Sequence, residues 1–135
     1  MSVLLRFPSP TPRALKKFVV YEKDLWICRN PESCGGRLAS VRDLSGSVTE
    51  VCEEKEGECL GPYKALASEE LDPNTVGFLA EVSRALAEAG VPLMVYSTFE
   101  RDYVLVPAEA LERAVEALEA AGFWVRFWEA PPTEP

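Results

Sequence analysis

The sequence predicts an α+β protein whose C-terminal half has the β-α-β-β-α-β order of ferredoxin-like folds. Two segments in this half repeat apolar residues at helical spacing, and short apolar runs typical of strands surround them. Each helical segment has a single apolar stripe, with charged residues on the opposite face. Two such helices fit one face of a four-stranded antiparallel sheet, so we expect that arrangement here.

The elements of the C-terminal half are bounded by helix-stop and turn residues. The first helix follows Asp72-Pro73, which offers an N-cap residue and a first-turn proline, and it ends at Gly90. The second helix covers 108–121 and stops at Gly122. Strands are expected at 61–67, 91–98, 102–106 and 123–128. The side chains predicted to face the core are Leu79, Val82, Leu86 and Ala89, then Leu111, Val115 and Leu118.

The N-terminal half reads as mostly β. We expect a strand at 3–7, a hairpin that joins 18–21 to 25–28, and a short strand at 47–52. The segment 29–46 is polar and carries glycine and proline, so no regular element is expected in it. This change of character divides the chain into a β subdomain at 1–58, a second domain at 59–130 and a disordered tail at 131–135.

Charge and composition exclude several classes of function. With 14 basic and 22 acidic residues the net charge is −8, which disfavours a nucleic-acid partner. The chain has no histidine, so a histidine-dependent triad is impossible within it. No paired-carboxylate site or phosphate loop is visible either. We therefore expect no catalysis and no cofactor.

Location is inferred from what the chain lacks. No apolar run approaches the ~20 residues needed to cross a bilayer, and the opening MSVLLRF does not resemble a signal peptide. We therefore expect a cytoplasmic protein that does not associate with membranes. Glutamine is absent, asparagine occurs only at 30 and 74, and proline is abundant. This composition is similar to that of thermophile proteins, and a GC-rich genome would give a similar bias.

Four cysteines stand at 28, 34, 52 and 59, all in the N-terminal half. Structural zinc sites usually place two to four residues between paired ligands, and these gaps are longer. Buried or free thiols are therefore favoured over a metal- or redox-active cysteine protein, which is kept as a third class of function, and no metal site is expected. A disulfide between two of them stays open for a hyperthermophile source, but spacing alone does not give the connectivity.

Two polar features suggest a binding site. Gly77 is expected near the start of the first helix, where glycine costs roughly 1 kcal/mol relative to alanine. Either close packing against a strand or a ligand on the helix-start amides would compensate. The join at 97–102 holds Ser97, Thr98 and Asp102, which either bond the turn backbone or bind a ligand. If the two features are adjacent, they suit a zwitterion such as an amino acid.

The segment 86–123 resembles ACT-domain proteins of the small amino-acid-binding type. The matching features are LAEAGV, the run ST-F-x-x-DY-x-LV from Ser97, and an acidic helix that ends in AGF. Gly61-Pro62 is similar to the family's GP-containing strand, and Val76-Gly77-Phe78 to its helix start. The family is similar in outline to the cytosolic arginine sensors, which bind the amino acid between two ACT repeats. The resemblance implies an ACT domain at 59–130 and a degenerate ACT-like half at 1–58.

What the resemblance implies is a non-catalytic regulatory or sensor protein that binds a small amino acid between its two halves. The alternative is a ligand-free ACT-type module for protein–protein assembly. The uncovered face of the sheet also leaves a surface for a homodimer. In the first half, SVTEVC at 47–52 is the nearest equivalent of a family motif. This loose match adds Thr49 to the implied ligand-binding residues. The implied ligand-binding residues are Thr49, Val76, Gly77, Phe78, Ser97, Thr98, Phe99 and Asp102.

One residue departs from the family pattern inside its most specific motif. Arg101 stands where the family usually has a threonine before the aspartate. An inward guanidinium would neutralise Asp102 and disfavour a basic ligand. Because neighbouring residues of a strand face opposite sides, we expect Arg101 to point to solvent.

Overall fold

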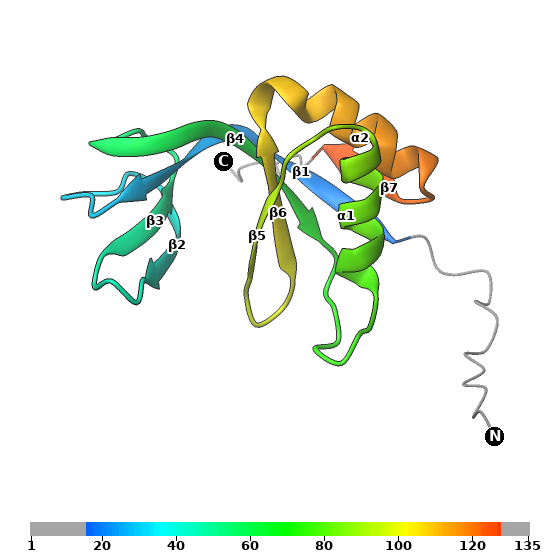
Figure 1. The fold of residues 1–135 in the computed structure, drawn as a ribbon, viewed down its shortest axis with the longest axis horizontal. Coiled ribbons are helices and arrows are strands. Elements are labelled where there is room, and N and C mark those ends of the chain that lie inside the picture. The colour runs from blue at the N-terminus through cyan, green and yellow to red at the C-terminus, as the bar shows by residue number, and fades with distance from the viewer. Residues whose placement is uncertain (1–15, 128–135) are drawn as a thin grey trace, which may run out of the picture.

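The computed structural model describes residues 16–127 and has the predicted α+β, ferredoxin-like fold (Figure 1). The strand expected at 3–7 and the disordered tail expected at 131–135 lie outside this range. Between residues 16 and 127, two helices and a short 3-10 turn accompany one large mixed sheet. The elements are β1 Lys17–Arg29, β2 Arg37–Arg42, β3 Val48–Cys52, β4 Glu58–Ser68, α1 Phe78–Glu88, β5 Met94–Ser97, β6 Asp102–Pro107, η1 Ala108–Ala110, α2 Leu111–Ala120 and β7 Trp124–Phe127.

The sheet is larger than the four strands expected. Its seven strands have the order β2-β3-β1-β4-β6-β5, and β7 pairs in parallel with β1. The first half of β1 therefore lies between β4 and β7, where Phe18 is opposite Ser68 on one side and Val125 on the other. The N-terminal half extends the sheet of the C-terminal half and supplies a strand to its centre.

The predicted hairpin at 18–21 and 25–28 is wrong, because both segments belong to the single strand β1. Glu22, Lys23 and Asp24 are exposed and mark a shift of register against β4 between Tyr21 and Leu25. A polar run of this kind is typical of a turn, but here it forms a bulge. Pairing to β4 along both halves of β1 keeps the chain extended through it.

The segment expected to have no regular structure contains β2. This strand pairs with β3 at the edge of the sheet, and most of its side chains are exposed. Short, polar edge strands expose little apolar surface and so give a weak sequence signal. Figure 1 shows β2 and β3 at the end of the sheet away from α1.

The main core lies between the helices and the sheet. Val82 and Leu86 of α1 and Leu118 of α2 are fully buried there, as predicted, against Phe18 of β1. The other predicted core positions, Leu79, Ala89, Leu111 and Val115, are partly buried against the same cluster. Both helices end where expected, with glycines at positive φ, 73° at Gly90 and 96° at Gly122.

The opposite face of the sheet is partly covered by the N-terminal strands. Leu38 of β2 and Val51 of β3 join a second apolar cluster with Tyr96 and Tyr103, whose rings stack 4.9 Å apart. Burial raises the pKa of Tyr96 to about 12, with a further contribution from Tyr103, so its hydroxyl is protonated at neutral pH. Outside this cover, Trp124 of β7 is 42% exposed. In the part of the chain described, no helix has the length and apolar character to cross a bilayer.

The preference for thiols is wrong, because the four cysteines form two disulfides. Cys28 bonds Cys59 and Cys34 bonds Cys52. Cys28 and Cys59 face each other in the register of β1 and β4, whereas Cys34 reaches Cys52 of β3 from the loop before β2. The first pairing follows from strand register and the second from the path of a loop, and spacing along the sequence reveals neither.

Candidate ligand-binding recess

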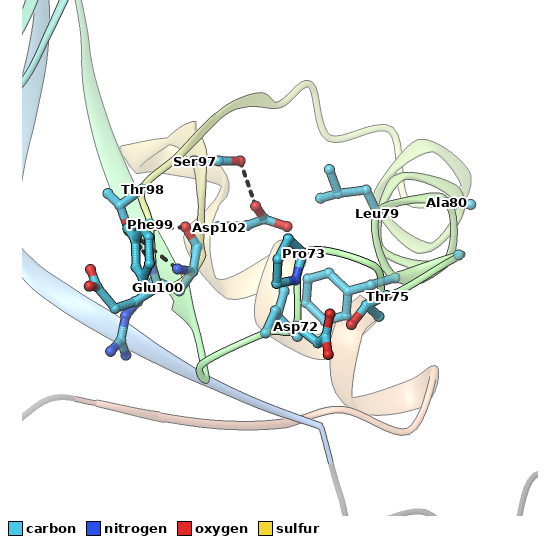
Figure 2. Close-up of a pocket in the computed structure, with 14 residues that line it drawn as sticks. Asp72, Pro73, Thr75, Leu79, Ala80, Ser97, Thr98, Phe99, Glu100 and Asp102 are labelled. Atoms are coloured by element: carbon cyan, nitrogen blue, oxygen red, sulfur yellow. Dashed lines mark hydrogen bonds between the residues drawn. The ribbon is translucent and has the colours of Figure 1, made fainter.

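A recess of about 430 Å³ lies beside the start of α1, and we call it the α1 recess (Figure 2). It is lined by the loop between β4 and α1, by the first residues of α1 and by the tip of the β5–β6 hairpin. Its volume falls within the range of small-molecule sites, about 300–1,000 Å³. The two polar features singled out in the sequence therefore border one cavity.

Backbone contacts hold these segments together. The amide of Leu71 in the β4–α1 loop donates to the carbonyl of Glu100 at the hairpin tip, at 2.9 Å. Asp72 does not cap the helix as predicted, because its carboxylate accepts the amide of Asn74 at 2.8 Å and closes a local turn. The helix begins later, at Phe78.

Within residues 16–127, the first backbone amides of α1 have no hydrogen-bond acceptor. Gly77 is the N-cap residue, and no side chain caps the helix. The first amide with an intrahelical partner is that of Glu81, which donates to the Gly77 carbonyl at 3.1 Å. Free amides and the helix dipole make this end of α1 attractive to a carboxylate.

Gly77 itself is explained by its backbone rather than by packing. Its φ is 90°, a left-handed conformation that residues with a side chain rarely adopt, and a Cβ built on it would meet nothing within 4 Å. Close packing against a strand is therefore not the reason for glycine at this position. The residue allows the loop to turn sharply into α1 and to leave the first amides open to the recess.

Replacing Gly77 by alanine is expected to lower the free energy of unfolding by about 1–2 kcal/mol, because a left-handed backbone is strained by a Cβ. Gly77→Asn is the matched control, since asparagine tolerates this conformation better and should cost less. Urea unfolding of the three proteins measures the difference. Equal stability of the alanine variant and the parent would show that the loop relaxes without cost.

The hairpin tip is built by Thr98. Its amide donates to the Arg101 carbonyl at 2.8 Å, and its hydroxyl accepts the amides of Glu100 and Arg101 at 3.3 and 3.2 Å. Thr98 therefore does what such residues often do in turns, and its hydroxyl is occupied by the backbone. Ser97 is different, because its hydroxyl donates to the side chain of Asp102 at 2.6 Å.

Asp102 is the carboxylate best placed in the α1 recess. Its amide donates to the hydroxyl of Ser68 at 3.0 Å, which fixes the start of β6, and Ser97 holds Oδ1. Within residues 16–127 no hydrogen bond occupies the other carboxylate oxygen. Figure 2 shows the Asp102 side chain directed toward Pro73 and Leu79 across the cavity. An oxygen in this position can accept a hydrogen bond from an ammonium or guanidinium.

Arg101 does not neutralise Asp102 in the described part of the chain. Its guanidinium donates to the carbonyl of Ser68 at 3.4 Å, and the ion pairs found between residues 16 and 127 do not join it to Asp102. The side chain is half-buried, not fully in solvent as expected, and also borders a smaller recess beside Tyr103.

The remaining predicted site residues differ in their positions. Phe78 lines the recess, but its side chain is 3% exposed and packs against Phe18 and Phe123, so its main contribution is its backbone. Phe99 also lines the recess and is 95% exposed. Val76 is 91% exposed beside Gly77 and is not among the lining residues.

Thr49 is separate from the other predicted residues. It lies on β3 and borders a recess that also contains Cys59 and Leu60. The lining of the α1 recess comes entirely from the C-terminal half, within 71–102, so the recess does not lie between two halves as expected. Sequence reasoning missed Ser68, which holds both Arg101 and Asp102 and is 1% exposed; a lone serine at a strand end gives no signal.

Comparison with known protein families finds a match to part of the chain. Residues 65–120 match the ACT domain family. This ACT segment runs from the second half of β4 to the end of α2, and it contains the whole lining of the α1 recess. No curated protein sequence matches the chain.

Solved structures share the fold at low sequence identity. A protein from Agobacterium tumefaciens is 18% identical with a TM-score of 0.72, and the alignment covers 90% of this chain and 100% of that one. A Vibrio cholerae protein of unknown function is 20% identical, with a TM-score of 0.63 and coverage of 79% and 90%. The regulatory subunit of aspartate kinase from Thermus flavus is 14% identical, with a TM-score of 0.57 and coverage of 81% and 99%.

Proposed function

We propose that this chain is a non-catalytic regulatory or sensor protein that binds a small amino acid in the α1 recess. One observation carries the proposal. The uncapped amides at the start of α1 and the carboxylate of Asp102 line the same cavity. A group that binds carboxylates and a group that binds cations, in one small recess, match the two charged ends of an amino acid.

Each group has a distinct role in this proposal. The amides of Phe78, Leu79 and Ala80 take the ligand carboxylate, because they are the free donors of the first turn. Asp102 binds the ammonium or a basic side chain of the ligand. Ser97 orients the Asp102 carboxylate by donating a hydrogen bond to its Oδ1. Phe99, whose side chain is 95% exposed at the hairpin tip, closes the recess over the ligand.

The ACT segment and the fold shared with a regulatory subunit of aspartate kinase support a regulatory role rather than a catalytic one. The resemblance to arginine sensors makes arginine one candidate ligand, because its guanidinium would suit Asp102. Arg101 opposes a strongly basic ligand only if its guanidinium leaves the Ser68 carbonyl. We also propose a cytoplasmic location. In a reducing cytoplasm the two disulfides would be uncommon, except in a hyperthermophile.

A thermal-shift screen of the twenty amino acids at millimolar concentration tests the proposal. One or a few should raise the melting temperature, because a ligand at 100 times its Kd stabilises the native state by about 2.7 kcal/mol. Asp102→Ala should abolish that shift. Glu116→Ala removes an exposed carboxylate on α2, outside the lining of the recess, and is the control that should keep the shift. A shift that persists in Asp102→Ala would place the ligand elsewhere.

A ligand-free assembly module is the alternative, and two exposed side chains favour it. Val76 and Phe99 are 91% and 95% exposed near the recess, where a partner or a second copy would bury them. This alternative would be supported if no amino acid raised the melting temperature and if the protein sedimented as a dimer at micromolar concentration. A monomer that responds to an amino acid would support the sensor.

A further inference from the structure

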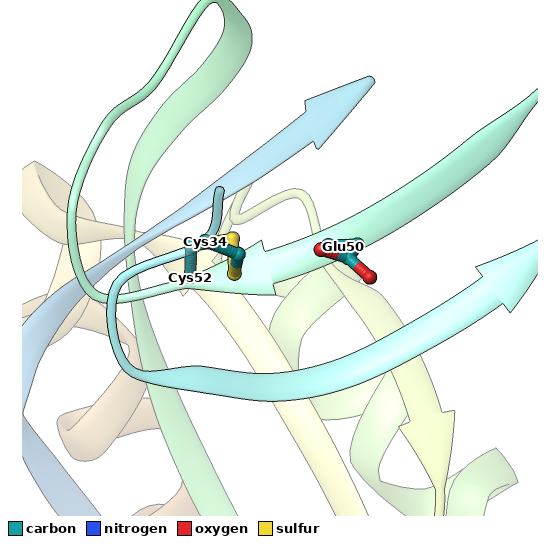
Figure 3. Close-up of side chains that lie close together, drawn as sticks. All are labelled: Cys34, Glu50 and Cys52. Carbon is teal, nitrogen blue, oxygen red and sulfur yellow. A yellow bond between two sulfur atoms is a disulfide. The ribbon is translucent and has the colours of Figure 1, made fainter. Parts of the chain in front are cut away.

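Far from the α1 recess, three side chains with metal-binding atoms converge on β3 (Figure 3). They are Cys34, Glu50 and Cys52, whose ligand atoms all lie within 4.8 Å of one another. Glu50 and Cys52 are two residues apart on one strand and so share a face of the sheet. Cys34 comes from the loop before β2 and is bonded to Cys52.

Glu50 is unusual because it is a carboxylate that is only 8% exposed. Arg37 and Ser40 both donate to its Oε2, at 3.1 and 2.9 Å. Among the hydrogen bonds within residues 16–127, none reaches Oε1. Figure 3 shows the carboxylate next to the Cys34–Cys52 disulfide, whose sulfurs carry no proton to donate to it. The mostly buried carboxylate therefore lies beside two sulfur atoms, with one oxygen free of hydrogen bonds within residues 16–127.

We propose that reduction of the Cys34–Cys52 disulfide converts these three side chains into a binding site for a soft divalent cation such as Zn²⁺. Two electrons and two protons from a thiol reductant break the sulfur–sulfur bond, giving two cysteine thiols and the oxidised disulfide of the reductant. The cation then displaces both thiol protons and binds two thiolates and Oε1 of Glu50. Three protein ligands leave a fourth position for water or another ligand.

The geometry and the charge both suit this cation. With zinc–sulfur bonds of about 2.3 Å, a tetrahedral site separates two sulfurs by about 3.8 Å, so each thiolate has to move little from its place in the disulfide. Zinc with two thiolates and one carboxylate carries a single negative charge. Arg37, bonded to the same carboxylate, balances it. Ser40 and Arg37 occupy Oε2 and so orient Oε1, as outer-shell partners of metal ligands do.

The other two cysteines are not part of this site. Among the described residues, the group of ligand atoms within 4.8 Å does not include Cys28 or Cys59. Those two form their own crosslink between β1 and β4. The proposal is independent of amino-acid binding, because none of these three residues lines the α1 recess.

The test uses the full chain, stripped of metal, with and without a phosphine reductant under anaerobic conditions. Co²⁺ is the spectroscopic probe, and Zn²⁺ is measured by competition with a coloured chelator. The reduced protein should bind one ion with two thiolate-to-cobalt charge-transfer contributions, and the oxidised protein none. Reduced protein with no such absorption would overturn the proposal, whatever the variants do.

Matched variants assign the ligands. Cys28→Ala/Cys59→Ala should keep the cobalt spectrum, and Cys34→Ala/Cys52→Ala should lose it. Glu50→Gln should weaken zinc binding by at least roughly tenfold, since even outer-shell losses cost about 10–100-fold. Loss of binding in the first double variant, or unchanged zinc affinity in Glu50→Gln, would contradict the three-residue site. Far-UV circular dichroism checks that each variant is folded.

Discussion

Replacing Phe18 by alanine is expected to lower the free energy of unfolding by about 3–5 kcal/mol. The side chain is fully buried, and its ring centroid lies 5.7 Å from that of Phe78 and 5.5 Å from that of Phe123. It therefore connects β1 to the start of α1 and to the residue before β7. The loss combines the transfer free energy of a large aromatic side chain with the cost of the cavity left behind.

Phe99→Ala is the matched control for this prediction. It deletes the same atoms at a position that is 95% exposed, so we expect a change within about 0.5 kcal/mol. Urea unfolding of both variants, with a common m-value, gives the comparison. A loss below about 1 kcal/mol in Phe18→Ala would mean that β1 is peripheral and that the segment 59–130 holds its own core. The division of the chain near residue 58 stays a prediction that this experiment addresses.

The helices could be predicted because their signals are local. Val82 and Leu86, or Val115 and Leu118, lie three or four residues apart, and this spacing alone indicates which face is buried. Glycine past each helix end is equally local, since Gly90 supplies the positive φ that the chain needs there. Hydrophobic period and helix-stop residues therefore gave the C-terminal elements and their order.

Strand pairing could not be predicted in the same way. Lys17 pairs with Trp124 across more than a hundred residues, and no local pattern records that contact. The bulge after Tyr21 carries the polar residues of a turn, and its extended shape depends on β4 beside it. Edge strand β2 gives little sequence signal, because an exposed edge needs few apolar residues.

The sequence predicts the residue types of the site better than it predicts where they lie relative to one another. Asp102 and Gly77 were recognised by residue type, and the recess brings their segments together. Gly77 had two explanations in the sequence, but its positive φ is a third that only backbone geometry reveals. Thr49 was included through a loose motif match, and it lies on a different strand pair. Local chemistry therefore gave candidates, while tertiary contacts decided which of them share a cavity.

Removal of the Cys28–Cys59 disulfide is expected to lower the free energy of unfolding by about 3–4 kcal/mol. The bond joins residues 31 apart in sequence, and a loop of this length restricts the unfolded chain substantially. It also fixes a register pair of β1 and β4, the two strands with the longest shared ladder. Cys28→Ala/Cys59→Ala is the variant to use, since alanine leaves no buried hydroxyl at Cys28, which is 1% exposed.

The same measurement under reducing conditions separates the crosslink from the side chains. The parent protein should lose stability when a reductant is added, whereas the double variant should lose only the part that belongs to Cys34–Cys52. That second bond closes a span of 18 residues, so its contribution should be the smaller of the two, about 3 kcal/mol. If the oxidised parent and the double variant unfold at the same urea concentration, the bond does not constrain the unfolded chain. The ladder between β1 and β4 would then hold the register without it.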